Sequence, residues 1–279
     1  MPLARFDRLP RPAQKALRGD AFPKFAATKS NEGIPNVVPL LSTSLADENT
    51  LIFVRMMIWK TARNLLANGR ITINVIGPGL YSWIVVGEFA EFVRQGPYLD
   101  YFNRKAMFRY NAYTGAGEVG VIRVREARGP VPLGLAAAMF YNLLREPVRA
   151  DGPGGHGPAV MPGPVLEKFN RRLALKHLGF VEEDGTPVAV PCLDLHARSA
   201  NDLAFVMPRN DDHPLSQLRP GMKVAGSVFT LAPVAYQVKG VFTGEEDQSG
   251  RRQGVIHLQE SYTAAPPVPG RRIFPPELS

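Results

Sequence analysis

The chain has 279 residues, of which 45% are hydrophobic, and it carries a formal net charge of +8. This length suits two domains of ordinary size or one large domain. The positive charge favours an anionic small molecule, and the lack of any Lys/Arg-rich block argues against a nucleic-acid partner.

Cysteine usage and the terminal segment narrow the class further. One cysteine, Cys192, excludes an intramolecular disulfide framework and a cysteine-based metal site, so we expect no metal. The first twenty residues are polar and lack the apolar core of a signal peptide. The longest apolar run, Gly134 to Leu144, is too short to cross a bilayer. We therefore expect a cytoplasmic protein without a membrane partner.

The chain begins with an expected arm over residues 1–20, which contains one short helix around Pro12 to Leu17. Runs of apolar and β-branched residues bounded by turn residues predict three strands after it. These strands are Phe22 to Lys29, Ile34 to Thr43 and Leu51 to Met57.

The stretch from Leu51 to Gly69 predicts a strand that runs into a short helix, Ala62 to Asn68, ended by Gly69. Two cations, a hydroxyl and an amide lie between the strand's end and the helix's first turn: Arg55, Lys60, Thr61 and Asn64. Free backbone N–H groups and the positive end of the helix dipole also point there, so the stretch predicts a phosphate site. The alternative is an ordinary solvated helix start.

Four segments in this order, ATKSNEGIPNVVPL, LIFV, KTARNLLANGRITI and VVGEF, resemble the flavin-binding split-barrel family of pyridoxamine-phosphate-oxidase-like proteins. The resemblance implies a small Greek-key barrel that dimerises and holds FMN at the interface. It places the FMN phosphate on Arg55, Lys60, Thr61 and Asn64. Backbone near the flavin ring would come from Val54 and Met56, with the strand around Val38 to Leu41 as a further candidate.

The remainder of the first half contains more strands and two expected helical segments. Strands are expected at Ile71 to Val75, at Tyr81 to Val93 with a bulge or bend at Gly87, and at Val119 to Ala127. Aromatic and basic residues are interleaved between Gly96 and Gly117, which favours a helical excursion packed on the barrel. The alternative is a surface that stacks a planar ligand or a nucleic-acid base. A clear helical pattern follows over Leu133 to Arg145, and then a Gly/Pro-rich linker.

The landmarks of the first half recur after the linker. Gly185 follows Gly33 by 152 positions within similar strand motifs, and Leu203 follows Leu51 by the same interval. We therefore predict a mainly β (α+β) fold of two tandem Greek-key split barrels with short helices, packed as an intramolecular pseudo-dimer. The expected boundaries are 1–20 for the arm, 21–150 for the first barrel, 151–164 for the linker and 165–279 for the second barrel.

The two copies differ where the phosphate site is expected. Arg55, Lys60, Thr61 and Asn64 become Met207, Asp212, His213 and Ser216. Because Asp211 and Asp212 would repel a phosphate, we expect one flavin per chain, with the second copy serving as a wall. Arg209 and His213 are the side chains expected to reach that ligand, although His213 is equally compatible with a neutral surface residue.

The resemblance implies an FMN-dependent oxidoreductase that meets a small-molecule substrate or electron donor, without predicting which one or naming catalytic residues. The alternative is a non-catalytic protein that binds flavin, haem or deazaflavin on the same barrel, as a carrier or sensor. The histidines at 177, 196, 213 and 257 leave haem open. The sequence leaves open whether the pseudo-dimer is monomeric or pairs further.

Overall fold

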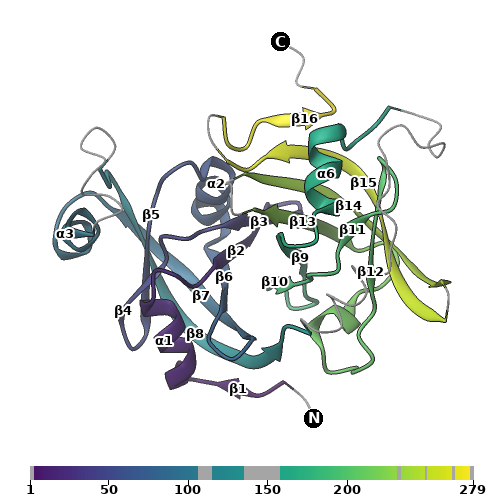
Figure 1. Ribbon diagram of the computed structural model, residues 1–279. Coiled ribbons are helices and arrows are strands. Elements are labelled where there is room, and N and C mark those ends of the chain that lie inside the picture. Colours follow the sequence, from purple (N-terminus) through teal and green to yellow (C-terminus); the bar gives the residue numbers. More distant parts are fainter. Residues whose placement is uncertain are drawn as a thin grey trace.

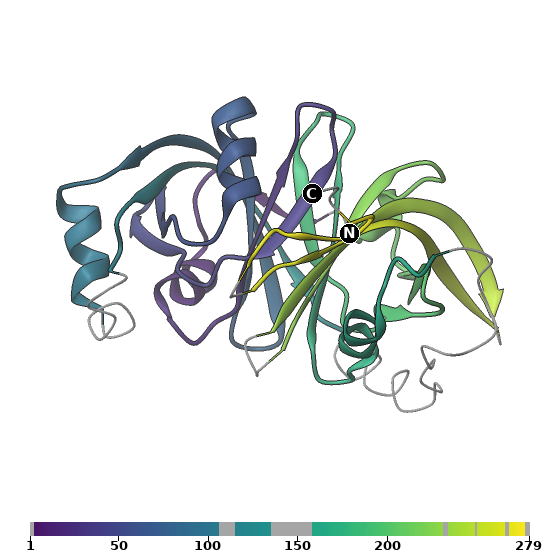
Figure 2. The same ribbon diagram turned by 90° about the horizontal axis from the view of Figure 1, so that it is seen from above.

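The computed structural model describes residues 3–105, 115–134, 158–230, 234–248, 250–265 and 268–276. The fold is mainly β and consists of two tandem split barrels, each built on an eight-stranded antiparallel sheet. The first half, purple to blue, lies beside the second half, green to yellow (Figures 1 and 2). His156, most of the linker and nearly all of the helix expected over Leu133 to Arg145 lie outside the described residues.

The first sheet has the strand order β3-β2-β6-β7-β8-β5-β4, and β1 pairs with β8 beside this path. The expected strands are confirmed, with ends shifted by a few residues. The elements are β1 (Arg5–Phe6), α1 (Arg11–Arg18), β2 (Lys24–Lys29), β3 (Pro35–Pro39), β4 (Ser44–Asp47), β5 (Thr50–Val54), α2 (Trp59–Asn68), β6 (Arg70–Ile76), β7 (Tyr81–Val93), α3 (Pro97–Arg104) and β8 (Val119–Pro132).

The second sheet repeats this order as β10-β9-β13-β14-β15-β12-β11, and β16 pairs with β15 beside the path. The identical order of seven strands confirms the duplication expected from the sequence landmarks. The elements are α6 (Gly163–Asn170), β9 (Leu175–Val181), β10 (Pro187–Pro191), β11 (His196–Ala197), β12 (Asp202–Val206), η1 (Pro214–Gln217), β13 (Lys223–Phe229), β14 (Ala235–Gln248), β15 (Arg251–Thr263) and β16 (Arg272–Phe274).

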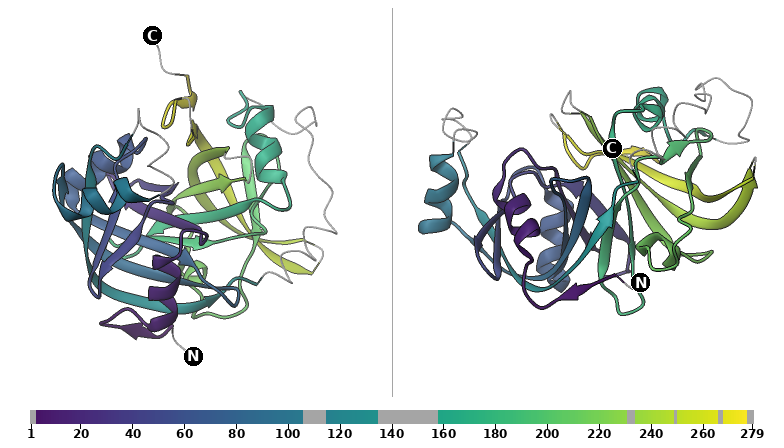
Figure 3. Two further views of the ribbon diagram at one scale, coloured as in Figure 1. Left: turned by 60° about the vertical axis from the view of Figure 1, so that its left-hand side comes forward. Right: turned by 60° about the horizontal axis from the view of Figure 1, so that its bottom comes forward.

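The helices are short and lie around the sheets. The helix expected near Pro12 to Leu17 is α1, which buries Ala13, Ala16 and Leu17 against the first core. The first part of the aromatic segment forms α3, which lies at the outer edge of the first half and buries Phe102 (Figure 3), and residues 106–114 lie outside the described part of the chain. In the part of the chain that the structure describes, no helix is both long and apolar enough to span a membrane.

Glycines let the long central strands bend in both halves. The register between β7 and β8 shifts at Gly87, as the sequence predicted, and a Cβ there would lie 2.5 Å from the Ile122 side chain. The register between β14 and β15 shifts at Gly240, where a Cβ would meet the His257 carbonyl oxygen at 2.1 Å. No larger residue fits either position, so both bends depend on glycine.

The two halves pack through the β2 and β3 side of one sheet and the β9, β10 and β13 side of the other. A small apolar cluster fills this contact, with Phe25, Ala27 and Val37 from the first half and Ala189 and Ala225 from the second. β2 and β10 are buried on both faces, and one of these faces would be uncovered in an isolated barrel.

Candidate functional site

A cavity of about 300 Å³ lies between the two halves. The first half contributes β3, the end of β5 and the start of α2, and the second half contributes β13, β14, the end of β15 and the segment after it. Its lining residues are Asn36, Val38 to Ser42, Val54, Met56 to Thr61, Phe229, Ala235, Gln237, Tyr262 to Ala265, Pro269 and Gly270. This volume and the mainly apolar lining are those of small-molecule sites.

The N-terminal end of α2 opens onto this cavity. Residues from Ile58 to Thr61 line it, and no side chain caps the helix at Ile58. The first turn of α2 holds no acidic residue, so the positive end of the helix dipole is uncompensated there. Backbone N–H groups of the first turn lack partners within a helix, which makes such an end an anion site.

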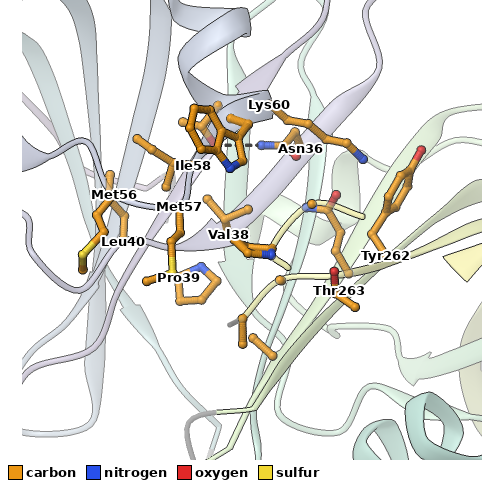
Figure 4. Close-up of a pocket in the computed structure, with 18 of the residues that line it drawn as sticks. Asn36, Val38, Pro39, Leu40, Met56, Met57, Ile58, Lys60, Tyr262 and Thr263 are labelled. Atoms are coloured by element: carbon orange, nitrogen blue, oxygen red, sulfur yellow. Dashed lines mark hydrogen bonds between the residues drawn. The ribbon is translucent and has the colours of Figure 1, made fainter. Parts of the chain in front are cut away.

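Lys60 extends from α2 toward the second half and meets Tyr262 (Figure 4). Its ammonium nitrogen lies 2.8 Å from the centroid of the Tyr262 ring. Burial, together with a hydrogen bond that the Tyr262 hydroxyl donates to Glu260, raises the pKa of Tyr262 to about 12. The ring is therefore neutral at physiological pH and presents its electron-rich face to the cation.

Asn36 places an amide at the floor of the cavity, where it is 2% exposed. Its Nδ2 donates to the Thr61 hydroxyl at 3.1 Å and to the Thr28 hydroxyl at 3.3 Å. Its Oδ1 is buried without a hydrogen-bond partner among the described residues. A buried acceptor of this kind carries a desolvation cost until a donor reaches it, so it is suited to an N–H or O–H of a ligand.

Asn64 lies outside the cavity lining. Its Nδ2 donates to the Thr28 hydroxyl at 3.0 Å, which ties the second turn of α2 to strand β2. The side chain is nearly buried, with 8% exposure. Asn64 therefore fastens α2 to β2 from a position outside the cavity lining, and the phosphate contact expected of it stays a prediction.

Arg55 also points away from the cavity. Its guanidinium stacks over the Phe92 ring, 4.8 Å from the centroid, and donates to Glu118 at 2.5 Å. Burial disfavours the charged form of Glu118, but hydrogen bonds from Arg94 and Arg55 outweigh this and lower its pKa. Arg55 and Glu118 line a separate small hollow beyond Met57 to Trp59. The pairing of β5 with β8 brings Glu118 next to Arg55, and the guanidinium group is therefore held outside the cavity where the sequence predicted a phosphate contact.

The other expected residues do line the cavity. Val54 and Met56 border it, as does the strand end from Val38 to Leu41. Its mouth carries four exposed apolar side chains, Leu41, Met56, Met57 and Trp59, which are 38%, 38%, 41% and 65% exposed. Such a rim favours apolar or planar molecules.

The wall from the second half consists of residues that the sequence reasoning missed. Gln237, Tyr262 and Thr263 line the cavity, whereas Arg209 and His213 do not. The Gln237 amide is itself fixed, because its Nε2 donates to the Val37 carbonyl of the facing half. Matching positions between the two copies could not reveal this wall, because it comes from strands that correspond to β7 and β8 rather than to the phosphate segment.

None of the described lining residues of this cavity is a histidine. His177 lies in the interface and stacks on Phe25 at 3.7 Å between centroids, and His257 contacts Asp202 at 3.0 Å. Over the described residues, no group of three His, Cys, Asp or Glu side chains could hold a metal ion.

Comparisons with known proteins find distant structural likenesses. No protein-family model matches the sequence, and no curated protein matches it either. HupZ from Group A Streptococcus is similar over 44% of this chain and 97% of its own, at 23% identity and a TM-score of 0.38. A putative pyridoxamine 5'-phosphate oxidase from Lactobacillus delbrueckii is similar over 46% of this chain and 98% of its own, at 16% identity and a TM-score of 0.36. The match to an FMN-binding protein from Syntrophomonas wolfei covers 37% of this chain and 74% of that protein's chain, at 14% identity and a TM-score of 0.33. A function for this chain therefore has to come from the geometry of its own site.

Proposed function

We propose that the cavity between the halves binds FMN and that the chain is a flavin-dependent oxidoreductase. The observation that carries this proposal is the uncapped start of α2, which opens onto an apolar cavity beside the Lys60 ammonium. A phosphate at that point would receive backbone N–H groups, the Thr61 hydroxyl and one full positive charge. Lys60 and Thr61 are the residues that hold it.

The remainder of the cavity suits a planar heterocycle. Val38, Pro39 and Phe229 supply apolar walls, and Val54 and Met56 border it on the side of β5. The Asn36 Oδ1 supplies an acceptor, which an N–H group of the ring system would satisfy. Arg55 and Asn64 act outside the cavity, the first in an ion pair and the second in fastening α2.

A bound flavin would supply the electron transfer, and the chain's part is to position it and to admit the substrate. The exposed rim of Leu41, Met56, Met57 and Trp59 favours an apolar or planar substrate at the mouth. A non-catalytic flavin carrier would use the same contacts. Reduced bound flavin that reoxidises faster when a substrate is added identifies an enzyme, and an unchanged rate across substrates identifies a carrier.

The phosphate contacts are tested by titrating the purified protein with FMN and with riboflavin, which lacks the phosphate. The wild-type protein should bind one FMN per chain in this cavity and bind it more tightly than riboflavin. In the Lys60→Ala, Thr61→Ala double variant, FMN affinity should fall about tenfold or more, because charge-assisted hydrogen bonds to the phosphate are lost. Riboflavin affinity should stay close to the wild-type value.

Arg55→Ala is the matched control, because it removes a nearby cation that faces Glu118 instead of the cavity. This variant should keep FMN affinity. A wild-type protein that takes up no FMN contradicts the proposal, and so does a double variant that binds FMN as tightly as the wild type. A Soret band in the absorption spectrum of the purified protein would show that the protein binds haem, and the flavin proposal would then be replaced by a haem-binding function.

A further inference from the structure

A second cavity, of about 720 Å³, lies at the matching position of the second half. It is lined by Pro132 to Gly134, Pro191 to Asp194, Val206 to Asn210, His213, Leu215 and Gly250 to Arg252. Nine of the lining positions follow first-cavity residues by 152 positions, among them Pro191 after Pro39, Val206 after Val54 and His213 after Thr61. The duplication has therefore kept both cavities.

Two pairs of hydrogen bonds donated by backbone N–H groups occur at matching places in the two cavity walls. The Val54 N–H donates to the Ser42 hydroxyl at 3.1 Å, and the Val206 N–H donates to the Asp194 carboxylate at 2.6 Å. The Arg55 N–H donates to the Glu118 carbonyl, and the Met207 N–H donates to the Arg252 carbonyl, both at 2.9 Å. Glu118 and Arg252 thus occupy the same place at the start of β8 and β15.

The second half carries arginines at two of these matching places. Arg252 stands where the first half has Glu118, and Arg209 stands where it has Met57. Arg251, the first residue of β15, also lines the second cavity. Three arginines therefore line one cavity, and a guanidinium group pairs well with phosphate and carboxylate oxygens.

The acidic groups near the cavity compensate this charge only in part, through an ion pair to Arg252. The Asp194 oxygens are directed into the protein, since they accept the Val206 N–H and the Cys192 thiol. Burial also raises the pKa of Asp194. Glu245 pairs with Arg252 at 3.2 Å on the exposed side. Asp211 and Asp212, which were expected to repel a phosphate, do not line the cavity.

His213 adds a neutral donor to the wall. Burial lowers the pKa of His213, which favours the neutral ring at physiological pH. Its Nδ1 accepts the Leu215 N–H at 3.3 Å, so the proton of the neutral ring resides on Nε2. The remaining lining is largely apolar, with Leu133, Met207 and Leu215 among its members.

We propose that this arginine-bordered cavity is a second binding site, for an organic phosphate with an apolar body. The arginines would bind the phosphate group, and the apolar lining would contact the rest of the molecule. The site differs from the first cavity, where the cation is one lysine at a helix start. The proposal does not depend on flavin binding, because no residue lines both cavities.

The test is a calorimetric titration of the full chain with phenyl phosphate and with inorganic phosphate at low salt. Phenyl phosphate should bind, and should bind at least about fivefold more tightly than inorganic phosphate because its ring is removed from water. The Arg209→Glu, Arg251→Glu variant should lose phenyl phosphate affinity by about tenfold or more. The Arg171→Glu, Arg172→Glu variant, which is matched in net charge and changes exposed residues outside the cavity lining, should keep it.

The Lys60→Ala, Thr61→Ala variant separates this site from the first. It should bind phenyl phosphate like the wild type, even if flavin binding is lost or never occurs. The proposal is overturned if the wild type binds no phenyl phosphate at low salt, if both charge-reversed variants lose it equally, or if the Lys60 variant loses it instead. Thermal denaturation of each variant checks that the fold is intact, and the single Arg209→Ala variant, at an exposed position, should still weaken binding measurably.

Discussion

Two basic residues five positions apart, Arg55 and Lys60, have opposite surroundings. Arg55 is held by Glu118, which lies 63 residues further along the chain and is brought to it by the pairing of β5 with β8. Lys60 projects across the interface to Tyr262 of the other half. The sequence motif predicts both residues as phosphate ligands, because their partners, Glu118 and Tyr262, lie far away in the sequence and do not appear in the local pattern.

At the same scale, Asn36 should contribute to flavin affinity through its buried Oδ1. In Asn36→Ala, FMN affinity should fall about threefold to tenfold, the loss expected for one neutral hydrogen bond. The measurement is fluorescence titration with FMN, with unfolding monitored in parallel. Asn64→Ala is the matched control, because it also breaks a bond to Thr28 but has no atom in the cavity lining. Equal losses of affinity in both variants would contradict a direct contact by Asn36.

The element that most distinguishes the two halves is α2. It spans ten residues and ends at Gly69, whose φ of +71° gives the left-handed conformation of a helix C-cap. The matching segment of the second half holds Pro214 and Pro220 and forms only the four-residue 3₁₀ helix η1. The start of an α-helix therefore lies at the first cavity and not at the second. In the second cavity, the positive charge proposed to bind an anion comes from arginine side chains instead.

The start of α2 gives a prediction at this scale. Trp59 lies in the first turn of α2 and is 65% exposed, so Trp59→Glu leaves the core intact. The new carboxylate is stabilised by the positive end of the helix dipole. The added charge would repel a phosphate, and FMN affinity should fall about tenfold or more while riboflavin affinity falls less. Leu66→Glu, on an exposed position near the other end of α2, is the control and should leave both affinities unchanged. An equal loss for FMN and riboflavin in Trp59→Glu would place the phosphate elsewhere.

At the scale of the whole molecule, the two halves meet around a matched pair of rings. Phe25 and His177, 152 positions apart, stack across the interface at 3.7 Å between centroids. The His177 Nε2 contacts the Asn74 Oδ1 of the first half at 3.1 Å. A nearly buried ion pair, Arg128 with Glu182, also joins the halves at 2.7 Å. These contacts hold in place the two walls on which the first cavity depends.

Acidification should loosen this interface through His177. Burial lowers the pKa of His177 to about 3, whereas an unfolded histidine titrates near 6.5. Between these values the unfolded chain takes up a proton that the folded chain does not, so stability is present above pH 6.5 and falls on acidification. The fall from this group is at most about 1.4 kcal/mol per pH unit.

The variant His177→Phe, which repeats the ring of Phe25, should reduce this slope between pH 6.5 and 4.5. The measurement is denaturant unfolding at several pH values for the variant and the wild type. Leu66→Gln, which changes an exposed side chain of α2 and removes no titratable group, is the control and should keep the wild-type slope. Identical slopes for wild type and His177→Phe would show that His177 does not couple the interface to pH.

The sequence alone determined the strands, the helix α2, the bend at Gly87 and the duplication. These features are local, because a strand or helix shows its own period and its own end residues, and a repeat shows a constant interval. It also indicated Lys60, Thr61, Val54 and Met56, since a strand that runs into a helix start places them at one point.

Only the tertiary structure decided which side chains line each cavity. The pairing of β5 with β8 turned Arg55 toward Glu118, and the packing of the halves brought Tyr262 and Gln237 to the first cavity. It also placed Arg209 and His213 in a separate second cavity and left Asp212 outside it. The physical reason is that a period along the chain sets which face a side chain occupies, whereas contacts between strands distant in sequence set what that face meets.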